Sequence, residues 1–150
     1  MEIRRIPCQV VWDYPEWPQI MGQYVNDVKH VEFTPEPDYD HYRAIEKAGF
    51  LVCIGAFNDG DLVGFCTYMK CPHPLRKGYM CAKTETFWVK PELRNHGIGK
   101  NLAEAVSQFA KDDGCDGIYW CVRTNTPAAA MMQKILGDPV ELSFFKNLRD

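Results

Sequence analysis

Residues 89–100 read Val89-Lys90-Pro91-Glu92-Leu93-Arg94-Asn95-His96-Gly97-Ile98-Gly99-Lys100. The segment joins the end of an apolar run to a turn with two glycines and then to the start of a helix. A helix N-terminus leaves about four backbone N–H groups without partners, and glycine lets the chain take positive φ and approach a ligand closely. The pattern therefore predicts an anion site, to which Arg94 and Lys100 add positive charge.

Two well-known phosphate motifs do not fit this segment. The pattern G-x-x-x-x-G-K-[ST] fails because Arg94 stands at the first glycine and Asn101 at the serine or threonine. The pattern G-x-G-x-x-G occurs nowhere in the chain. The sequence therefore disfavours a P-loop nucleotidase or a dinucleotide-binding fold.

The segment instead resembles the GNAT superfamily of N-acetyltransferases. Its residues from Arg94 to Gly99 fit R/Q-x-x-G-x-G/A, the loop that binds the pyrophosphate of acetyl-coenzyme A, and the preceding Val89-x-Pro91-Glu92-Leu93 is also similar. Asn125 followed by Ala128 resembles the N-x-x-A segment of the same family. The order of predicted elements matches along most of the chain.

This resemblance implies acetyl-coenzyme A as co-substrate and direct acetyl transfer to an amine, with no covalent enzyme intermediate. The loop residues would bind the pyrophosphate through backbone amides: Asn95, His96, Gly97, Ile98, Gly99 and Lys100. The pantetheine arm would pair with the end of the preceding strand as an additional strand does. The residues of that strand end are Phe87, Trp88 and Val89. Asn125 would contact the cofactor near its reactive end.

Glu85 is the candidate general base. It is the only carboxylate on its predicted strand, it lies two residues before Phe87 on the same face, and the family's bases often occupy this strand. The alternative is an ordinary polar residue at a strand edge. The general acid is unassigned, because the family's tyrosine seven residues after the asparagine corresponds to Met132 here. Tyr119, Tyr68 and the amine's own released proton remain alternatives.

Hydrophobic periodicity and turn residues predict the remaining elements. In chain order they are a strand at 3–6, helices at 16–30 and 38–48, a hairpin of strands 50–57 and 62–69, a strand at 79–89, a helix at 99–113, a strand at 117–122, a helix at 126–137 and a strand at 141–148. With the resemblance, this order implies an α/β (α+β) fold in one domain spanning residues 1–150. Its mixed, mostly antiparallel sheet would have about six to seven strands, with about four helices, splayed in the middle around acetyl-coenzyme A.

Composition narrows the class of protein. The chain has 150 residues, 46% of them hydrophobic and 25% charged, which suits one folded domain and excludes a disordered chain. Its formal net charge of -3 lacks the basic excess of a nonspecific nucleic-acid binder. Between residues 71 and 100, however, basic residues outnumber acidic ones by six to two, a local field that suits coenzyme A phosphates.

Several further expectations concern partners and location. The seven cysteines contain no C-x-x-C pair, and the chain shows neither a long apolar run nor a secretory leader, so we expect buried thiols and a cytoplasmic protein without a membrane partner. No histidine has a partner at metal-ligand spacing, so we expect no metal. The acidic residues Glu32, Glu36, Asp38 and Asp40 suggest a cationic acceptor amine or a solvated turn.

Two questions stay open at this level. The acceptor is unidentified, and Met132 and the short C-terminus leave a catalytically silent, cofactor-binding domain as the alternative to an enzyme. The single strand expected at 141–148 implies either a shortened sheet or one completed by another subunit in a homodimer.

Overall fold

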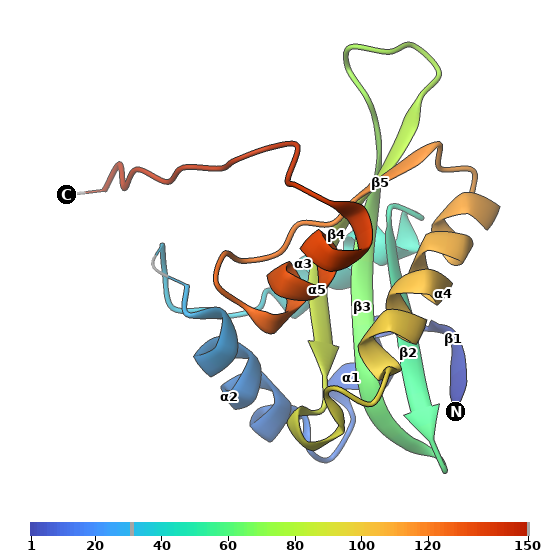
Figure 1. The fold of residues 1–150 in the computed structure, drawn as a ribbon, viewed down its shortest axis with the longest axis vertical. Helices are drawn as coiled ribbons and strands as arrows, with labels where there is room; N and C mark the ends of the chain where they lie inside the picture. The colour runs from blue at the N-terminus through green and yellow to red at the C-terminus, as the bar shows by residue number, and fades with distance from the viewer. Residues whose placement is uncertain (31, 150) are drawn as a thin grey trace.

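A five-stranded sheet forms the centre of the computed structural model, which describes residues 1–30 and 32–149 (Figure 1). The strands are β1 (Glu2–Ile6), β2 (Leu51–Asn58), β3 (Asp61–Pro72), β4 (Met80–Val89) and β5 (Gly117–Tyr119). They lie in the order β1-β2-β3-β4-β5. The first four pair antiparallel, and β5 pairs parallel to β4.

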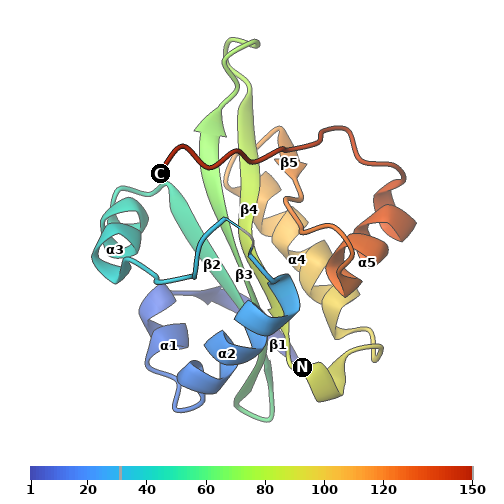
Figure 2. The same ribbon diagram turned by 90° about the vertical axis from the view of Figure 1, so that its left-hand side faces the viewer.

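Helices cover both faces of the sheet. They are α1 (Cys8–Trp12), α2 (Trp17–Val28), α3 (Tyr39–Lys47), α4 (Ile98–Asp112) and α5 (Pro127–Leu136), with a 3-10 turn η1 (Pro91–Leu93) before α4. Figure 2 shows α1, α2 and α3 on one side of the strands and α4 and α5 on the other. Two buried clusters correspond to these layers, one centred on Ile54 and Leu102 and the other on Ile20 and Phe65.

The central strands are continuously apolar because both of their faces are covered. All residues of β2 except the last are buried. The β2–β3 hairpin turns at Asp59 and Gly60, both at positive φ, as its turn residues predict. One irregularity interrupts the β3–β4 ladder: Thr67 pairs with Thr86 and Tyr68 with Thr84, which leaves Glu85 without a register partner.

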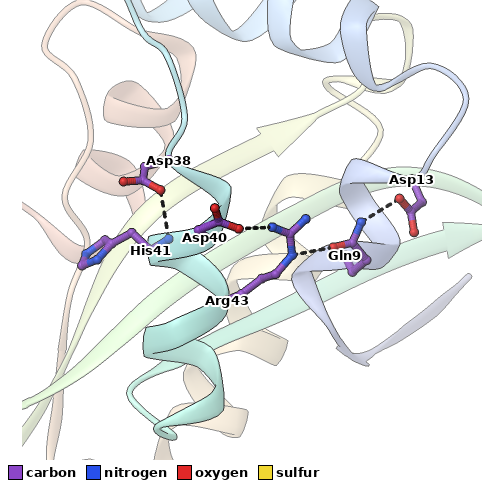
Figure 3. Close-up of polar contacts among 6 residues, drawn as sticks. All are labelled: Gln9, Asp13, Asp38, Asp40, His41 and Arg43. Carbon is purple, nitrogen blue, oxygen red and sulfur yellow. Dashed lines mark hydrogen bonds and ion pairs between the residues drawn. The ribbon is translucent and has the colours of Figure 1, made fainter.

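Polar contacts tie α3 to α1 beside the sheet. Arg43 donates to Asp40 at 2.9 Å within α3 and to Gln9 of α1 at 3.0 Å (Figure 3). Asp38 accepts from the backbone N–H of His41 and caps α3. Asp38 and Asp40, two of the four acidic residues considered for amine binding, therefore already accept hydrogen bonds within the protein.

The mixed α/β class is confirmed, but the expected six to seven strands and four helices are wrong. The described residues form five strands and five helices; α1 is an additional short helix, and β5 is shorter than expected. Residues 141–148, expected as a strand, form no strand in the described structure. The alternating pattern there is real, but a strand also needs a neighbour to satisfy its backbone, and the segment lies apart from the sheet edge (Figure 1).

Candidate functional site

The strands β4 and β5 pair over only part of their length. Their register covers Cys81 to Lys83 opposite Gly117 to Tyr119, and one further contact runs from the Cys121 N–H to the Thr84 hydroxyl at 2.9 Å. Beyond Thr84, β4 pairs with β3 alone. Residues 85–89 therefore offer a free backbone edge on the β5 side, where an extended ligand can add as a strand does.

The chain leaves this free edge directly into the N-terminus of α4. Asn95 and Gly97 both have positive φ, and Gly97 is the N-cap, with no side chain capping the helix. The first helical turn therefore keeps backbone donors free for an external anion, and the macrodipole adds partial positive charge. Anion binding at this turn stays a prediction.

Arg94 is engaged within the protein. Its Nε donates to the backbone carbonyl of Val89 at 2.9 Å, and its Nη2 donates to Asp27 of α2 at 2.6 Å. The guanidinium therefore fixes the turn against α2. Lys100, in contrast, is exposed and lies 3.8 Å from Glu104.

Gly99 lies where α4 approaches α5 closely. A Cβ built there would stand 3.3 Å from Met131 Sδ and 3.8 Å from Val89 Cγ2. The second glycine of the loop therefore serves helix packing, whereas Gly97, with a φ of 83° and open space around it, serves the turn.

The other predicted cofactor residues lie on β4 and in the segment between β5 and α5. The Phe87 ring meets Trp120, just after β5, edge-to-face at 5.8 Å between ring centroids. Trp88 is buried against Phe65 on the opposite face, so only its backbone borders the gap. Asn125 is exposed and has a left-handed backbone conformation. It directly precedes Thr126, the N-cap of α5.

Glu85 is exposed on β4, at the ladder irregularity. Its charge adds to the effect of burial in raising the pKa of Tyr24 and of Tyr42. The carboxylate is therefore close enough to Tyr24 of α2 and Tyr42 of α3 for its charge to act on both phenols. That position leaves it accessible to an incoming amine.

Tyr24 of α2 is a candidate that helical periodicity alone did not reveal. Thr86 of β4 and Arg123, after β5, lie close enough to act on the phenol, and both favour its ionised form. Burial outweighs both influences and raises the pKa of Tyr24. A protonated phenol therefore lies near the point where β4 and β5 diverge.

Arg123 joins the chain after β5 to the loop after α2. It donates to Glu32 at 2.5 Å and contacts His30 through the Nδ1 atom. Burial and the neighbouring Arg123 lower the pKa of His30, and the Arg123 hydrogen bond lowers the pKa of Glu32. A cavity of about 340 Å³ borders this cluster. The positive charge of Arg123 therefore balances the negative charge of Glu32. This pairing weakens the hypothesis that Glu32 alone attracts a cationic amine.

The alternative acids are placed differently: Tyr68 lies beside Asp113 in the core, whereas Tyr119 ends β5 in the last pair of the β4–β5 ladder. Tyr68 is fully buried and donates to Asp113 at 2.5 Å, and burial raises its pKa strongly. Lys83 lies over the Tyr119 ring at 5.5 Å. Met132 is buried, and its thioether carries no acidic proton, so this position supplies no general acid.

The thiols are free, and four of the seven are buried. Burial raises the pKa of Cys66 and Cys81, which keeps these thiols protonated. Among residues 1–30 and 32–149, no three His, Cys, Asp or Glu side chains gather as a metal site would require. Within the same residues, no helix is long and apolar enough to cross a bilayer.

A five-stranded sheet that opens beside a glycine turn defines the class of GNAT-like proteins. The family model described as acetyltransferase (GNAT) family matches residues 12–138, and the chain belongs to this family. A search of curated protein sequences found no match.

Solved structures share the fold at low sequence identity. A ribosomal-protein-alanine N-acetyltransferase from Brucella melitensis biovar Abortus 2308 is similar with a TM-score of 0.73 and 17% identity, covering 99% of this chain and 100% of that one. An aminoglycoside acetyltransferase from an uncultured soil metagenomic sample has a TM-score of 0.73 and 14% identity, covering 99% and 98%. The enzyme AAC(6')-Iy, in complex with the bisubstrate analogue CoA-S-monomethyl-acetylneamine, has a TM-score of 0.70 and 20% identity, covering 99% and 98%.

Proposed function

We propose that this chain is an acetyl-coenzyme A-dependent N-acetyltransferase that transfers the acetyl group directly to a primary amine. One observation carries the proposal: the free edge of β4 at residues 85–89 leads directly into the uncapped N-terminus of α4. A ligand with an extended amide arm and a diphosphate matches both features at once.

The residues present fit this co-substrate. The turn from Asn95 to Lys100 supplies backbone donors for the diphosphate, and the edge of Phe87, Trp88 and Val89 supplies donors and acceptors for the pantetheine amides. The bound thioester supplies the activated acetyl group. The protein holds its arm in one orientation, which places the acetyl group near the divergence of β4 and β5.

Glu85 is the proposed general base. An amine is nucleophilic only when neutral, so its ammonium proton must leave before attack. The exposed Glu85 carboxylate, close enough to Tyr24 and Tyr42 for its charge to act on them, accepts this proton directly or through one water.

Tyr24 is the proposed general acid, replacing the helix tyrosine whose position Met132 occupies. Its hydroxyl lies beside Thr86, one residue from Glu85 along β4. The raised pKa keeps the phenol protonated, so it can give its proton to the departing thiolate sulfur and regain one from solvent. The acceptor is a small cationic amine, a peptide or a protein bearing a primary amine.

The decisive experiment measures thiol release from acetyl-coenzyme A across a panel of polyamines, aminoglycosides and peptides with free N-termini. Wild type should release thiol with at least one amine, and Glu85→Gln should lower kcat by about a hundredfold. Calorimetric affinity for coenzyme A should be unchanged in this variant. Glu92→Gln, an exposed carboxylate on η1, is the matched control and should keep wild-type kcat.

A different result separates the alternative role. If coenzyme A binds but no amine releases thiol above background, the chain is a catalytically silent binding domain. If folded protein does not bind coenzyme A, the proposal fails as a whole.

A further inference from the structure

The basic residues between positions 71 and 100 lie toward opposite ends of β4. Those that border the turn before α4 each form an ion pair with a carboxylate: Lys90, Arg94 and Lys100. The others belong to the β3–β4 hairpin, defined here as residues 70–83, which extends beyond the helices in Figure 1: Arg76, Lys77 and Lys83. Because β4 has ten residues, its two ends lie about 30 Å apart. The Debye length at physiological ionic strength is about 8 Å, so charges at the hairpin tip do not assist an anion at the turn.

The hairpin carries positive charge without any carboxylate of its own. Its four cations are Lys70, Arg76, Lys77 and Lys83. The rest of the chain has 13 Lys and Arg residues against all 20 of the Asp and Glu residues. None of the four cations forms an ion pair within residues 1–30 and 32–149. The neighbouring Asp116 accepts from the backbone N–H of Met80 at 2.9 Å instead. The hairpin is therefore a basic projection on an otherwise acidic molecule.

Contacts within the hairpin tip hold its conformation. The backbone N–H of His73 donates to the carbonyl of Tyr79 at 2.8 Å, and the Tyr79 N–H donates to the carbonyl of Arg76 at 3.1 Å. The N–H of Leu75 donates to Nδ1 of His73 at 3.2 Å. The Arg76 guanidinium lies over the Tyr79 ring, 5.1 Å from its centroid. A tip that is ordered before binding loses little conformational entropy when a partner docks.

Leu75 adds an apolar contact point beside the cations. It is 91% exposed and directly precedes Arg76 and Lys77 in the sequence. Within the hairpin it is the one large apolar side chain that is exposed to this degree. An apolar side chain flanked by cations complements a segment in which carboxylates flank an apolar residue.

The same features disfavour two other kinds of partner. A nucleic-acid strand binds through free aromatic faces, but Tyr79 is the only aromatic residue between positions 70 and 83, and Arg76 and His73 pack against its ring. A long polyanion would also extend over the acidic remainder of the chain. A membrane surface needs several apolar side chains to insert, and the hairpin offers Leu75 alone.

We propose that the β3–β4 hairpin docks an acidic segment of a protein partner. Carboxylates of that segment pair with Arg76 and Lys77, and an apolar side chain between them packs on Leu75. Lys70 and Lys83 extend the attractive field along the two strands. The surface does not depend on acetyl transfer or on coenzyme A.

Fluorescence anisotropy of a labelled peptide tests this surface in the full chain. The probe is a short peptide of alternating glutamate and serine with one central leucine, and its glutamine counterpart is the uncharged control. Wild type should bind the acidic peptide, less tightly as salt is raised, and should not bind the glutamine peptide. Arg76→Glu should weaken binding at least about tenfold. Leu75→Ser should weaken it about threefold, because the apolar contact is lost.

Matched measurements separate the hairpin from the rest of the molecule. Lys134→Glu makes the same charge change at an exposed lysine of α5 and should keep wild-type peptide affinity. Arg76→Glu should keep wild-type affinity for coenzyme A, and circular dichroism verifies that each variant is folded. A fall in coenzyme A affinity in Arg76→Glu would overturn the proposal, because the hairpin would then serve the cofactor.

Three further results would overturn it. The first is no binding of the acidic peptide by wild type. The second is equal weakening in Arg76→Glu and Lys134→Glu, which would show attraction by overall charge and not by the hairpin. The third is tighter binding of a single-stranded oligonucleotide, or of vesicles containing phosphatidylserine, than of the peptide, with the tighter binding lost in Arg76→Glu.

Discussion

The guanidinium of Arg94 and the carboxylate of Asp27 lie 2.6 Å apart, and this pair links the turn before α4 to helix α2. Arg94 also holds the carbonyl of Val89, the last residue of β4. One side chain thus connects the strand edge, the anion turn and the helix that carries Tyr24. The two halves of the proposed site are coupled through it.

Removing the Asp27 charge should loosen the turn. For Asp27→Asn we expect coenzyme A binding to weaken by up to about fivefold, because a partly exposed ion pair contributes about 0.2–1 kcal/mol. Calorimetry measures this. Asp40→Asn removes the Asp40–Arg43 pair on α3 and should leave the affinity unchanged. Equal affinities in all three proteins would refute the coupling.

Charge at Gly97 should prevent diphosphate binding. Gly97→Asp places a carboxylate at the N-cap and should weaken coenzyme A binding at least about tenfold. Gly97→Asn keeps the size and tolerates positive φ, so it should bind far better than the aspartate variant. Gly114→Asp is a second control, since Gly114 has a φ of 85° at the other end of α4 with open space around it. Titration calorimetry and urea unfolding separate binding from stability.

Loss of the Tyr24 hydroxyl should slow acetyl transfer without weakening coenzyme A binding. For Tyr24→Phe we expect kcat to fall about ten- to a hundredfold, with unchanged affinity for coenzyme A. Tyr14→Phe, which removes a hydroxyl bonded to Leu62 and Asp61 away from the gap, should keep full kcat. Steady-state thiol release measures both. If Tyr24→Phe keeps wild-type kcat, Tyr24 is not the general acid. The proton released by the amine would then protonate the thiolate.

Asp113 should make stability depend on pH. Burial raises the pKa of Asp113, but the hydrogen bonds from Arg5 and Tyr68 outweigh burial and hold it below its usual range. The unfolded carboxyl titrates near 3.9, so the ionised side chain stabilises the fold above that pH, and the contribution is lost as pH falls through the lower folded pKa.

Asp113→Asn should therefore lower the free energy of unfolding by about 1 kcal/mol at pH 7, with little difference from wild type at pH 2 to 3. Urea unfolding across this range provides the test. If the two proteins differ in free energy of unfolding by the same amount at every pH, the changed shape of the side chain, and not its lost charge, explains the lower stability.

The local features that depend on a few neighbouring residues were predictable from the sequence. The Asp59–Gly60 hairpin, the Thr126–Pro127 helix start and the Gly97 turn each follow from intrinsic backbone preferences. The prediction failed at residues 141–148, where apolar and polar residues alternate as in a strand but pair with no strand in the described structure. Pairing is a property of two segments, and one segment cannot specify it.

The backbone conformation of the anion loop was set by its own residues, because glycine at positive φ and an uncapped helix start need no distant contact. The approach of Tyr24 to Thr86, the Arg94–Asp27 pair and the Arg123–Glu32 contact arise only in the folded chain. Their partners are separated by 62, 67 and 91 residues, and only the packing of α2 against the diverging strands brings them together.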